Sequence, residues 1–229
     1  MVAAQNGMFT LGHITMFYAM TSGAKLSREA SAVVSRLSTF RLTPKRLLTY
    51  MSITDQIRAK VREHQGVSLF EIPPSLEGEG IIRELIVSEE VLRAISPPWP
   101  PHREGERHAS FRALLDAFVQ NEEISVSETP FSKPWDTGIA RVHPVSDEIW
   151  DIRSFEMPPG MRCFGAFGGY NLFIALTWNY REAIETAEDW EYETNRCKEV
   201  WSSLFGQIER FRGEQLDEYL SSFLDLSAN

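Results

Sequence analysis

The chain lacks the cysteines of a disulfide framework. Cys163 and Cys197 are the two cysteines among its 229 residues, and so few cysteines in a chain of this length are typical of a reducing compartment. It also lacks a run of 18 apolar residues, so we predict no membrane-spanning helix. We therefore expect a soluble, cytoplasmic protein.

The sequence patterns of common catalytic and ligand-binding sites are also missing. No Gly-x-Gly-x-x-Gly stands between a predicted strand and a predicted helix, which excludes a dinucleotide-binding loop. The histidines do not share one helix face, and no cysteine or carboxylate pattern completes a zinc site. We expect neither a metal nor a cofactor. The five histidines are His13, His64, His102, His108 and His143.

What the chain does have is an uneven distribution of charge. Its formal net charge is −9. Residues 1–50 contain six basic residues and one acidic residue, a net charge of +5, so residues 51–229 contain 17 basic and 31 acidic residues, a net charge of −14. This asymmetry indicates that the two parts of the chain differ in kind.

Three interpretations of residues 1–50 stay open. The segment is basic, rich in serine and nearly free of acids, which is typical of a targeting segment. It could instead be an N-terminal arm, or upstream sequence included by mistake before a true start at Met51. The third interpretation is supported by the residues after Met51, because Ser52 or Thr54 can cap a helix that runs to about His64.

Residues 51–229 are predicted to form a single α+β domain. With 43% apolar residues the chain can bury a sizeable core. Ser88 is a suitable N-cap for a short helix that runs to Ile95. The prolines on either side of Trp99 forbid a continued helix, so residues 97–101 are predicted to be a Pro-rich hinge.

The period of the apolar residues changes along this domain. Phe111 and Phe118 lie on one face of a helix that we expect near 106–120. From about 138 to 178 the apolar residues occur in short segments separated by Pro, Gly and Asp or Ser, which predicts a small antiparallel sheet. The last two of these strands should form a hairpin, because the residues between them tolerate positive φ.

A long apolar stripe of helical period predicts a further helix over about 186–211. The stripe favours a helix that packs on the sheet; a homodimer through this helix is the alternative. Acidic residues near the helix start indicate either a solvated end that matches the helix dipole or a docking surface for a basic protein partner. These residues are Glu182, Glu185, Glu188, Asp189, Glu191 and Glu193.

The predicted strands also carry a polar patch. Arg141 and His143 share one face of their strand, Asp151 and Arg153 share a face of the next, and Arg162 lies on the third. The planar fork of arginine binds phosphate or carboxylate, so Arg141, His143 and Asp151 are candidate binding residues. The alternative is a set of cross-strand ion pairs on a solvated face.

The segment 149–177 resembles the strand core of the RelE/HigB-like toxin superfamily. The resemblance rests on Trp-Asp-Ile-Arg at 150–153, Gly-Met-Arg-Cys-Phe at 160–164 and Phe-Ile-Ala-Leu-Thr at 173–177. In that superfamily a strand ends in an arginine, the next strand begins with Gly-x-Arg, and an apolar strand follows. The resemblance implies a small bacterial α+β protein, and many members of the superfamily cleave mRNA on the ribosome.

The same resemblance implies roles for four residues. Arg153 and Arg162 would bind phosphate or stabilise the transition state. Tyr180 and Arg181, directly after the third strand, would occupy the region where such toxins often keep a functional aromatic or basic residue. These four are the candidate catalytic residues.

The net charge of the domain favours a different function. Binding to RNA or the ribosome draws on many contacts from Lys and Arg to phosphate, and a net charge of −14 on residues 51–229 would repel a polyanion. We therefore favour a non-enzymatic interaction or binding protein with a toxin-like sheet and a protein partner. An mRNA-cleaving toxin, or its degenerate descendant, with RNA or the ribosome as partner is the alternative.

Overall fold

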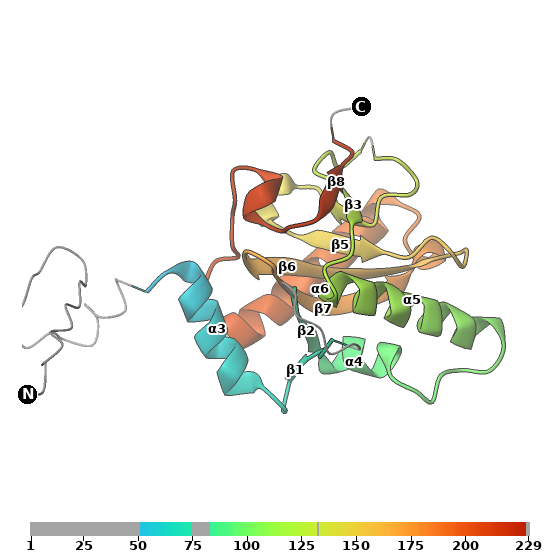
Figure 1. Cartoon of the computed structure of the whole chain (residues 1–229), viewed down its shortest axis with the longest axis horizontal. Coiled ribbons are helices and arrows are strands. Elements are labelled where there is room, and N and C mark those ends of the chain that lie inside the picture. Colours follow the sequence, from blue (N-terminus) through green and yellow to red (C-terminus); the bar gives the residue numbers. More distant parts are fainter. Residues whose placement is uncertain (1–50, 75–82, 132, 228–229) are drawn as a thin grey trace, which may run out of the picture. The chain divides into compact units, whose positions relative to one another are not determined.

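The computed structural model describes residues 51–74, 83–131 and 133–227, and the three interpretations of residues 1–50 concern a segment outside this part. The described residues form one sheet with helices on both faces (Figure 1). The α-helices are α3 (Ile53–His64), α4 (Glu89–Ile95), α5 (Arg103–Val119) and α6 (Ala187–Phe205). The strands are β1 (Leu69–Glu71), β2 (Glu84–Ser88), β3 (Ile124–Ser127), β4 (Ile139–Arg141), β5 (Trp150–Arg153), β6 (Met161–Gly169), β7 (Leu172–Tyr180) and β8 (Phe223–Asp225).

The sheet has eight strands in the order β1-β2-β7-β6-β5-β4-β3-β8. Strands β4 to β7 are antiparallel and include the predicted hairpin of β6 and β7. On one side β2 joins β7 in parallel, and on the other side β3 runs parallel to both β4 and β8. The α+β prediction is confirmed. The prediction of a small antiparallel sheet over 138–178 is wrong. The antiparallel strands β4 to β7 form only the middle of the sheet, and strands from elsewhere in the chain extend it on both sides.

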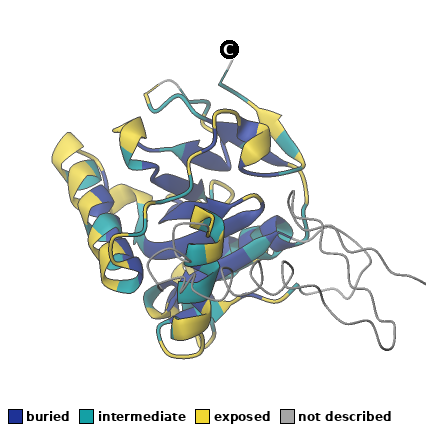
Figure 2. Cartoon of the chain, turned by 90° about the vertical axis from the view of Figure 1, so that its left-hand side faces the viewer, coloured by how far each residue is buried: buried dark blue, intermediate teal, exposed yellow. Residues whose placement is uncertain are grey.

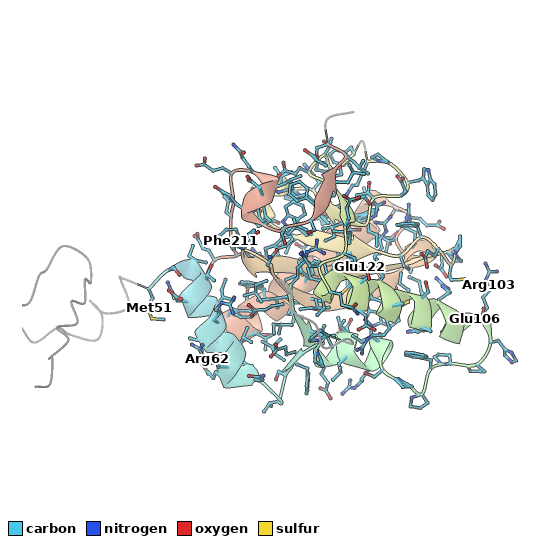
Figure 3. The ribbon with its side chains drawn as sticks, in the orientation of Figure 1. Met51, Arg62, Arg103, Glu106, Glu122 and Phe211 are labelled. Atoms are coloured by element: carbon cyan, nitrogen blue, oxygen red, sulfur yellow. The ribbon has the colours of Figure 1, made fainter. Side chains whose placement is uncertain are left out.

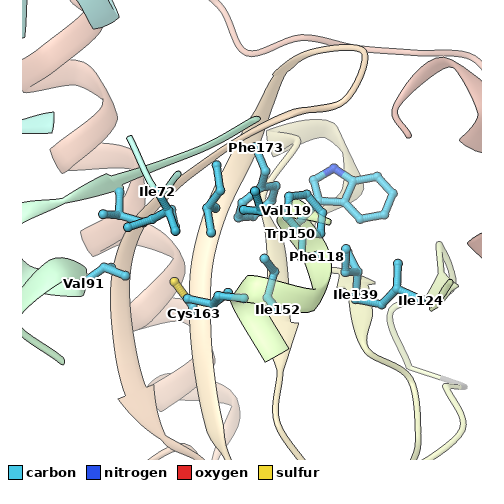
Figure 4. Packing of buried hydrophobic residues seen from close by; sticks show 14 of the residues in the cluster. Ile72, Val91, Phe118, Val119, Ile124, Ile139, Trp150, Ile152, Cys163 and Phe173 are labelled. Atoms are coloured by element: carbon cyan, nitrogen blue, oxygen red, sulfur yellow. The ribbon is translucent and has the colours of Figure 1, made fainter. Parts of the chain in front are cut away.

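Two buried clusters lie on the two faces of the sheet. On one face α4 and α5 cover a cluster that includes Phe118, Trp150 and Phe173 (Figure 4). On the other face α3 and α6 cover a second cluster. The residues Leu172 to Thr177 of β7 are buried, because this central strand is covered on both faces. Figure 2 shows the buried residues concentrated in the strands, while the outer faces of the helices are exposed.

Polar side chains fix where several helices begin and end. Ser52 accepts a hydrogen bond from the backbone N–H of Asp55 and caps α3, and Ser88 caps α4 in the same way, as predicted. Helix α5 begins at Arg103, three residues before the expected start. Helix α6 ends at Phe205 rather than at 211, because Gly206 has a φ of 64°, which a helix cannot continue.

The apolar stripe of α6 packs on the sheet. Cys197, Trp201 and Phe205 are each at most 2% exposed and belong to the cluster between α6 and the strands. The predicted core-facing helix is therefore confirmed. A homodimer through α6 stays a prediction, and it would have to use a face of the helix other than this stripe.

Many charged side chains of the helices lie on the outside of the domain, although Arg107 of α5 and Glu193 of α6 are buried. Figure 3 shows the labelled Arg62, Arg103 and Glu106 at the periphery of the domain. Among the helices of the described residues, none combines the length and the apolar character that a membrane crossing requires. Residues 97–101 connect α4 to α5, and their role as a hinge stays a prediction.

Candidate functional site

A cleft of about 690 Å³ lies between the segment after β3, the facing ends of β5 and β6, and α6. We call it the arginine cleft. Among its lining residues in the described part of the chain, Glu191 is the single carboxylate. Its cationic lining residues are Lys133, Arg153, Arg162, Arg181 and Lys198. A domain of strong negative charge thus has one concave surface of opposite sign.

Strand alternation places the two central arginines of this cleft. Arg153 ends β5 and Arg162 is the second residue of β6, and the antiparallel register sets them directly opposite each other. Their neighbours Ile152 and Cys163 pack on the α5 side of the sheet. Because successive side chains point to opposite faces, both guanidinium groups lie on the α6 side.

Asp151 lies between these arginines and is fully buried. Its Oδ2 accepts a hydrogen bond from Nη1 of Arg162 and lies 3.7 Å from Nε of Arg153. Burial alone would raise the pKa of this carboxyl group, but Arg162, Lys133 and Arg153 hold the pKa below its usual value. The aspartate is therefore ionised and offsets part of the repulsion between two like charges that face each other across strands.

One carboxylate does not satisfy both guanidinium groups. The Arg153 side chain is 12% exposed, and its Nη1 is buried without a hydrogen-bond partner among the described residues. Burial lowers the pKa of Arg153, although the group stays a cation. A buried donor without an acceptor costs about 1–3 kcal/mol. Arg153 therefore offers hydrogen-bond donors that an anion in the cleft could use.

Lys133 adds a third cationic group from the loop before β4. Its Nζ donates a hydrogen bond to the backbone oxygen of Arg141, 2.9 Å away. Burial lowers the pKa of Lys133 to about 8; Asp151 raises that pKa, and Arg153 and Arg162 lower it. Within the described residues no carboxylate oxygen lies within 4 Å of its Nζ.

Aromatic side chains complete the cleft. The guanidinium carbon of Arg162 lies 5.1 Å from the ring centre of Trp190, a geometry that orients the guanidinium group. His143 is exposed and its ring centre lies 4.9 Å from that of Phe131, which is 82% exposed. Arg181 is exposed and donates to the backbone oxygen of Ile184. The cleft therefore combines fixed cations with apolar walls.

Arg141 does not join the other candidate residues. It packs on the α5 side of the sheet, where its guanidinium carbon lies 5.3 Å from the ring centre of Trp150. There it pairs with Glu148 and Glu128 and reaches the hydroxyl of Tyr219. Of the three candidate binding residues, His143 lines the cleft, Asp151 lies beneath the arginines, and Arg141 lies on the opposite face.

Tyr180 is also separated from the arginine cleft. It lies on the α5 side, where its hydroxyl oxygen is 2.8 Å from Nε2 of His108 and 2.8 Å from Oε1 of Glu104. Burial and the hydrogen bond to Glu104 raise its pKa to about 12. The guanidinium carbon of Arg107 lies 4.1 Å from the ring centre. Of the four candidate catalytic residues, only Arg153, Arg162 and Arg181 lie together.

The prediction of a solvated face on β5 is wrong. Asp151 is 0% exposed and the Arg153 side chain 12%, because α6 covers this face of the sheet. The pattern of alternating apolar and charged residues is real, but the charged residues are buried as a group. The predicted ion pairing of Asp151 with arginine is present in this buried setting.

Sequence reasoning missed Lys133, Trp190 and Lys198 as residues of the cleft. Lys133 stands in a loop next to Pro134, where no periodicity indicates a direction. Trp190 and Lys198 lie on α6 and reach the cleft because the helix crosses the sheet face at this end. The available signal was a lone lysine in the loop directly before three arginine-bearing strands.

A smaller cavity of about 480 Å³ lies next to the start of α3. Its lining includes Asp147, Glu148, Arg210 and Arg212. Arg212 pairs with Glu148 at 2.9 Å and Asp147 pairs with Lys198 at 2.7 Å. The lining of this cavity holds acidic and basic residues in similar number, whereas the lining of the arginine cleft is strongly cationic, so the arginine cleft is the stronger candidate for binding an anion.

Comparisons of the chain with models of protein families, with curated proteins and with solved structures found no match. The candidate function therefore rests on the site alone.

Proposed function

We propose that the protein is a binding protein whose arginine cleft takes a small anionic ligand, a compound with a carboxylate or phosphate group. One observation carries the proposal: Asp151 is the buried counterion for Arg153, Arg162 and Lys133 together. The positive charge in excess of this counterion favours an anion in the cleft. A guanidinium donates two parallel hydrogen bonds to a carboxylate or phosphate, which adds geometric specificity.

The size of the cleft supports a small ligand. At about 690 Å³ it falls in the range of about 300–1,000 Å³ that is common for small-molecule sites. The cations lie inside a concave surface, where low-dielectric walls strengthen their attraction for an anion. The net charge of −14 on residues 51–229 repels long polyanions but has less effect on a ligand that fits within the cleft.

The RNA-cleaving alternative draws on the same residues. Three of its candidates, Arg153, Arg162 and Arg181, line one cleft, which favours phosphate contact. Its fourth candidate, Tyr180, has its hydroxyl group engaged by His108 and Glu104 on the other face of the sheet. The separation supports ligand binding over cleavage in this cleft.

Calorimetric titration of the full chain with citrate and with pyrophosphate tests the proposal. The titration is done in chloride buffer at constant ionic strength. We expect saturable binding at one site, and Arg153→Gln should weaken binding about tenfold or more, since a hydrogen bond to a charged group contributes about 1.5–3 kcal/mol. Arg181→Gln, at an exposed residue of the same cleft, should weaken binding with little effect on folding.

A matched control separates the cleft from general charge. Arg93→Gln removes the same charge from the surface of α4, where Arg93 pairs only with the exposed Glu89 among the described residues. It should bind both anions like the unmodified protein. The proposal is overturned if neither citrate nor pyrophosphate binds. It is also overturned if the Arg153 and Arg93 variants bind the anions equally well. Binding of a single-stranded RNA oligomer with cleavage of that oligomer would favour the alternative.

A further inference from the structure

Lys133 is the nucleophilic group of the arginine cleft that anion binding leaves unexplained. A lysine that only attracts an anion needs no burial, whereas this residue is half-buried and lines the cleft together with Arg153 and Arg162. The one hydrogen bond that its Nζ makes with the described residues goes to the backbone oxygen of Arg141. No carboxylate of the described residues holds it as an ion pair.

We propose that Lys133 forms a Schiff base with a small anionic carbonyl compound, a 2-oxo acid, whose carboxylate is held by Arg153 and Arg162. The proposal rests on anion binding by the same cleft and adds the chemical class of the ligand. Lysine is the side chain that forms such adducts, and desolvation or a neighbouring cation activates it.

The electrostatic environment keeps part of the Lys133 amine neutral. The groups that face it are Asp151, which raises its pKa, and Arg153 and Arg162, which lower it; burial is the largest effect and the resulting pKa is about 8. At pH 7.4 roughly a fifth of the amine is then neutral, against about one part in a thousand for a lysine of ordinary pKa. Only the neutral amine has the lone pair that attacks a carbonyl carbon.

The chemical step balances without an oxidant or reductant. The Nζ lone pair forms a bond to the carbonyl carbon, and the carbonyl oxygen takes up the two protons that the amine gives up and leaves as water. The product is a carbon–nitrogen double bond to Lys133, which water can hydrolyse again. The arginines hold the carboxylate next to the carbonyl carbon, so the attack takes place within a bound complex. The outcome is reversible covalent capture of the ligand.

Trapping with borohydride tests the proposal on the full chain. Borohydride delivers a hydride to the imine carbon and converts the adduct to a stable secondary amine. With pyruvate as the probe, we expect intact mass spectrometry to show one adduct per chain and peptide mapping to place it on Lys133. The trapped fraction should rise about sixteenfold between pH 6.5 and pH 8, since the neutral fraction of a group with a pKa of about 8 follows its titration.

Two lysine variants separate the site from general lysine reactivity. Lys133→Arg keeps a cation in the cleft and should abolish the adduct. Lys60→Arg alters a lysine of α3 outside the cleft, which pairs with Glu63 at 2.7 Å, and should leave the adduct unchanged. Arg153→Gln should reduce trapping of pyruvate at least fivefold. Trapping of methyl pyruvate, a neutral ester, should fall much less, because the ester loses no ion pair and is affected only by the higher pKa of Lys133 in this variant.

The outcomes distinguish this inference from the proposed function. Saturable binding of citrate without any pyruvate adduct leaves anion binding in place and overturns the Schiff base. An adduct spread over several lysines, or one that persists in Lys133→Arg, also overturns it. If neither citrate nor pyrophosphate binds and no adduct forms, both proposals fail.

Discussion

Arg153 and Arg162 lie directly opposite each other on β5 and β6 and share Asp151 as their counterion. Two like charges in this position oppose strand pairing, and the pairing persists because the aspartate is buried between them. The same arrangement leaves guanidinium donors available toward α6. Stability and the proposed binding site therefore depend on one carboxylate.

Asp151→Asn should destabilise the fold strongly. Removing one partner of a buried ion pair leaves the remaining charges uncompensated, which costs about 3–5 kcal/mol. Urea unfolding followed by tryptophan fluorescence measures the free energy of unfolding. The control is Glu63→Gln, which breaks the exposed pair with Lys60 on α3 and should cost far less, because exposed ion pairs contribute little to stability. Similar losses in the two variants would contradict the role given to Asp151.

The contribution of Asp151 should also disappear in acid. Its pKa in the folded chain is lowered, so the unfolded chain takes up a proton at higher pH than the folded chain does. The stability that Asp151 provides is thus complete above the ordinary aspartate pKa of about 3.9 and is lost as the pH falls below it. The difference in unfolding free energy between the unmodified protein and Asp151→Asn should be constant from pH 7 to 5 and shrink towards pH 3. A difference that stays the same at pH 3 would argue against an ionised Asp151.

Local signals in the sequence were sufficient for the antiparallel centre of the sheet. The caps at Ser52 and Ser88 and the hairpin of β6 and β7 depend on residues a few positions apart, and all three are present. The outer strands depend on distant partners. Strand β2 pairs with β7 across about 90 residues, and no local period indicates that parallel pairing.

The candidate site was predictable only in part for the same reason. Strand alternation sets Arg153 and Arg162 on one face, and this much can be derived from the sequence. Whether that face is solvated depends on α6, which comes after the strands in the chain and covers them. Lys133 enters from a loop without periodicity, and Tyr180 leaves for the other face because its position in β7 pairs with Met161, on the α5 side.

Ser88 should contribute more to stability than an ordinary N-cap. Its hydroxyl oxygen accepts from the backbone N–H of Val91 and the hydroxyl group donates to the backbone oxygen of Leu176 at 2.6 Å. Ser88→Ala removes the cap, about 1 kcal/mol, and leaves a buried carbonyl without this donor, about 1–3 kcal/mol. Ser52→Ala is the matched control, since Ser52 is an exposed N-cap. Chemical denaturation should show a loss about 1 kcal/mol or more larger for Ser88→Ala; equal losses would exclude a contribution from the bond to Leu176.

Lys133→Met should stabilise the protein at neutral pH and lose this advantage in alkaline solution. A lysine in the unfolded chain has a pKa of about 10.4, whereas the pKa of Lys133 in the folded chain is about 8. Below pH 8 both states bind the proton and the full cost of burying the cation is present. Between pH 8 and pH 10 the unfolded chain holds a proton that the folded chain has lost, so the stability of the unmodified protein rises with pH relative to the variant.

Urea unfolding of both proteins at pH 7, 8, 9 and 10, in buffers without multivalent anions, measures the difference in unfolding free energy. Lys198→Met is the control, because that lysine is paired with Asp147 and its removal should give no such rise. If the difference in unfolding free energy between Lys133→Met and the unmodified protein does not change with pH, the environment of Lys133 does not favour the neutral amine.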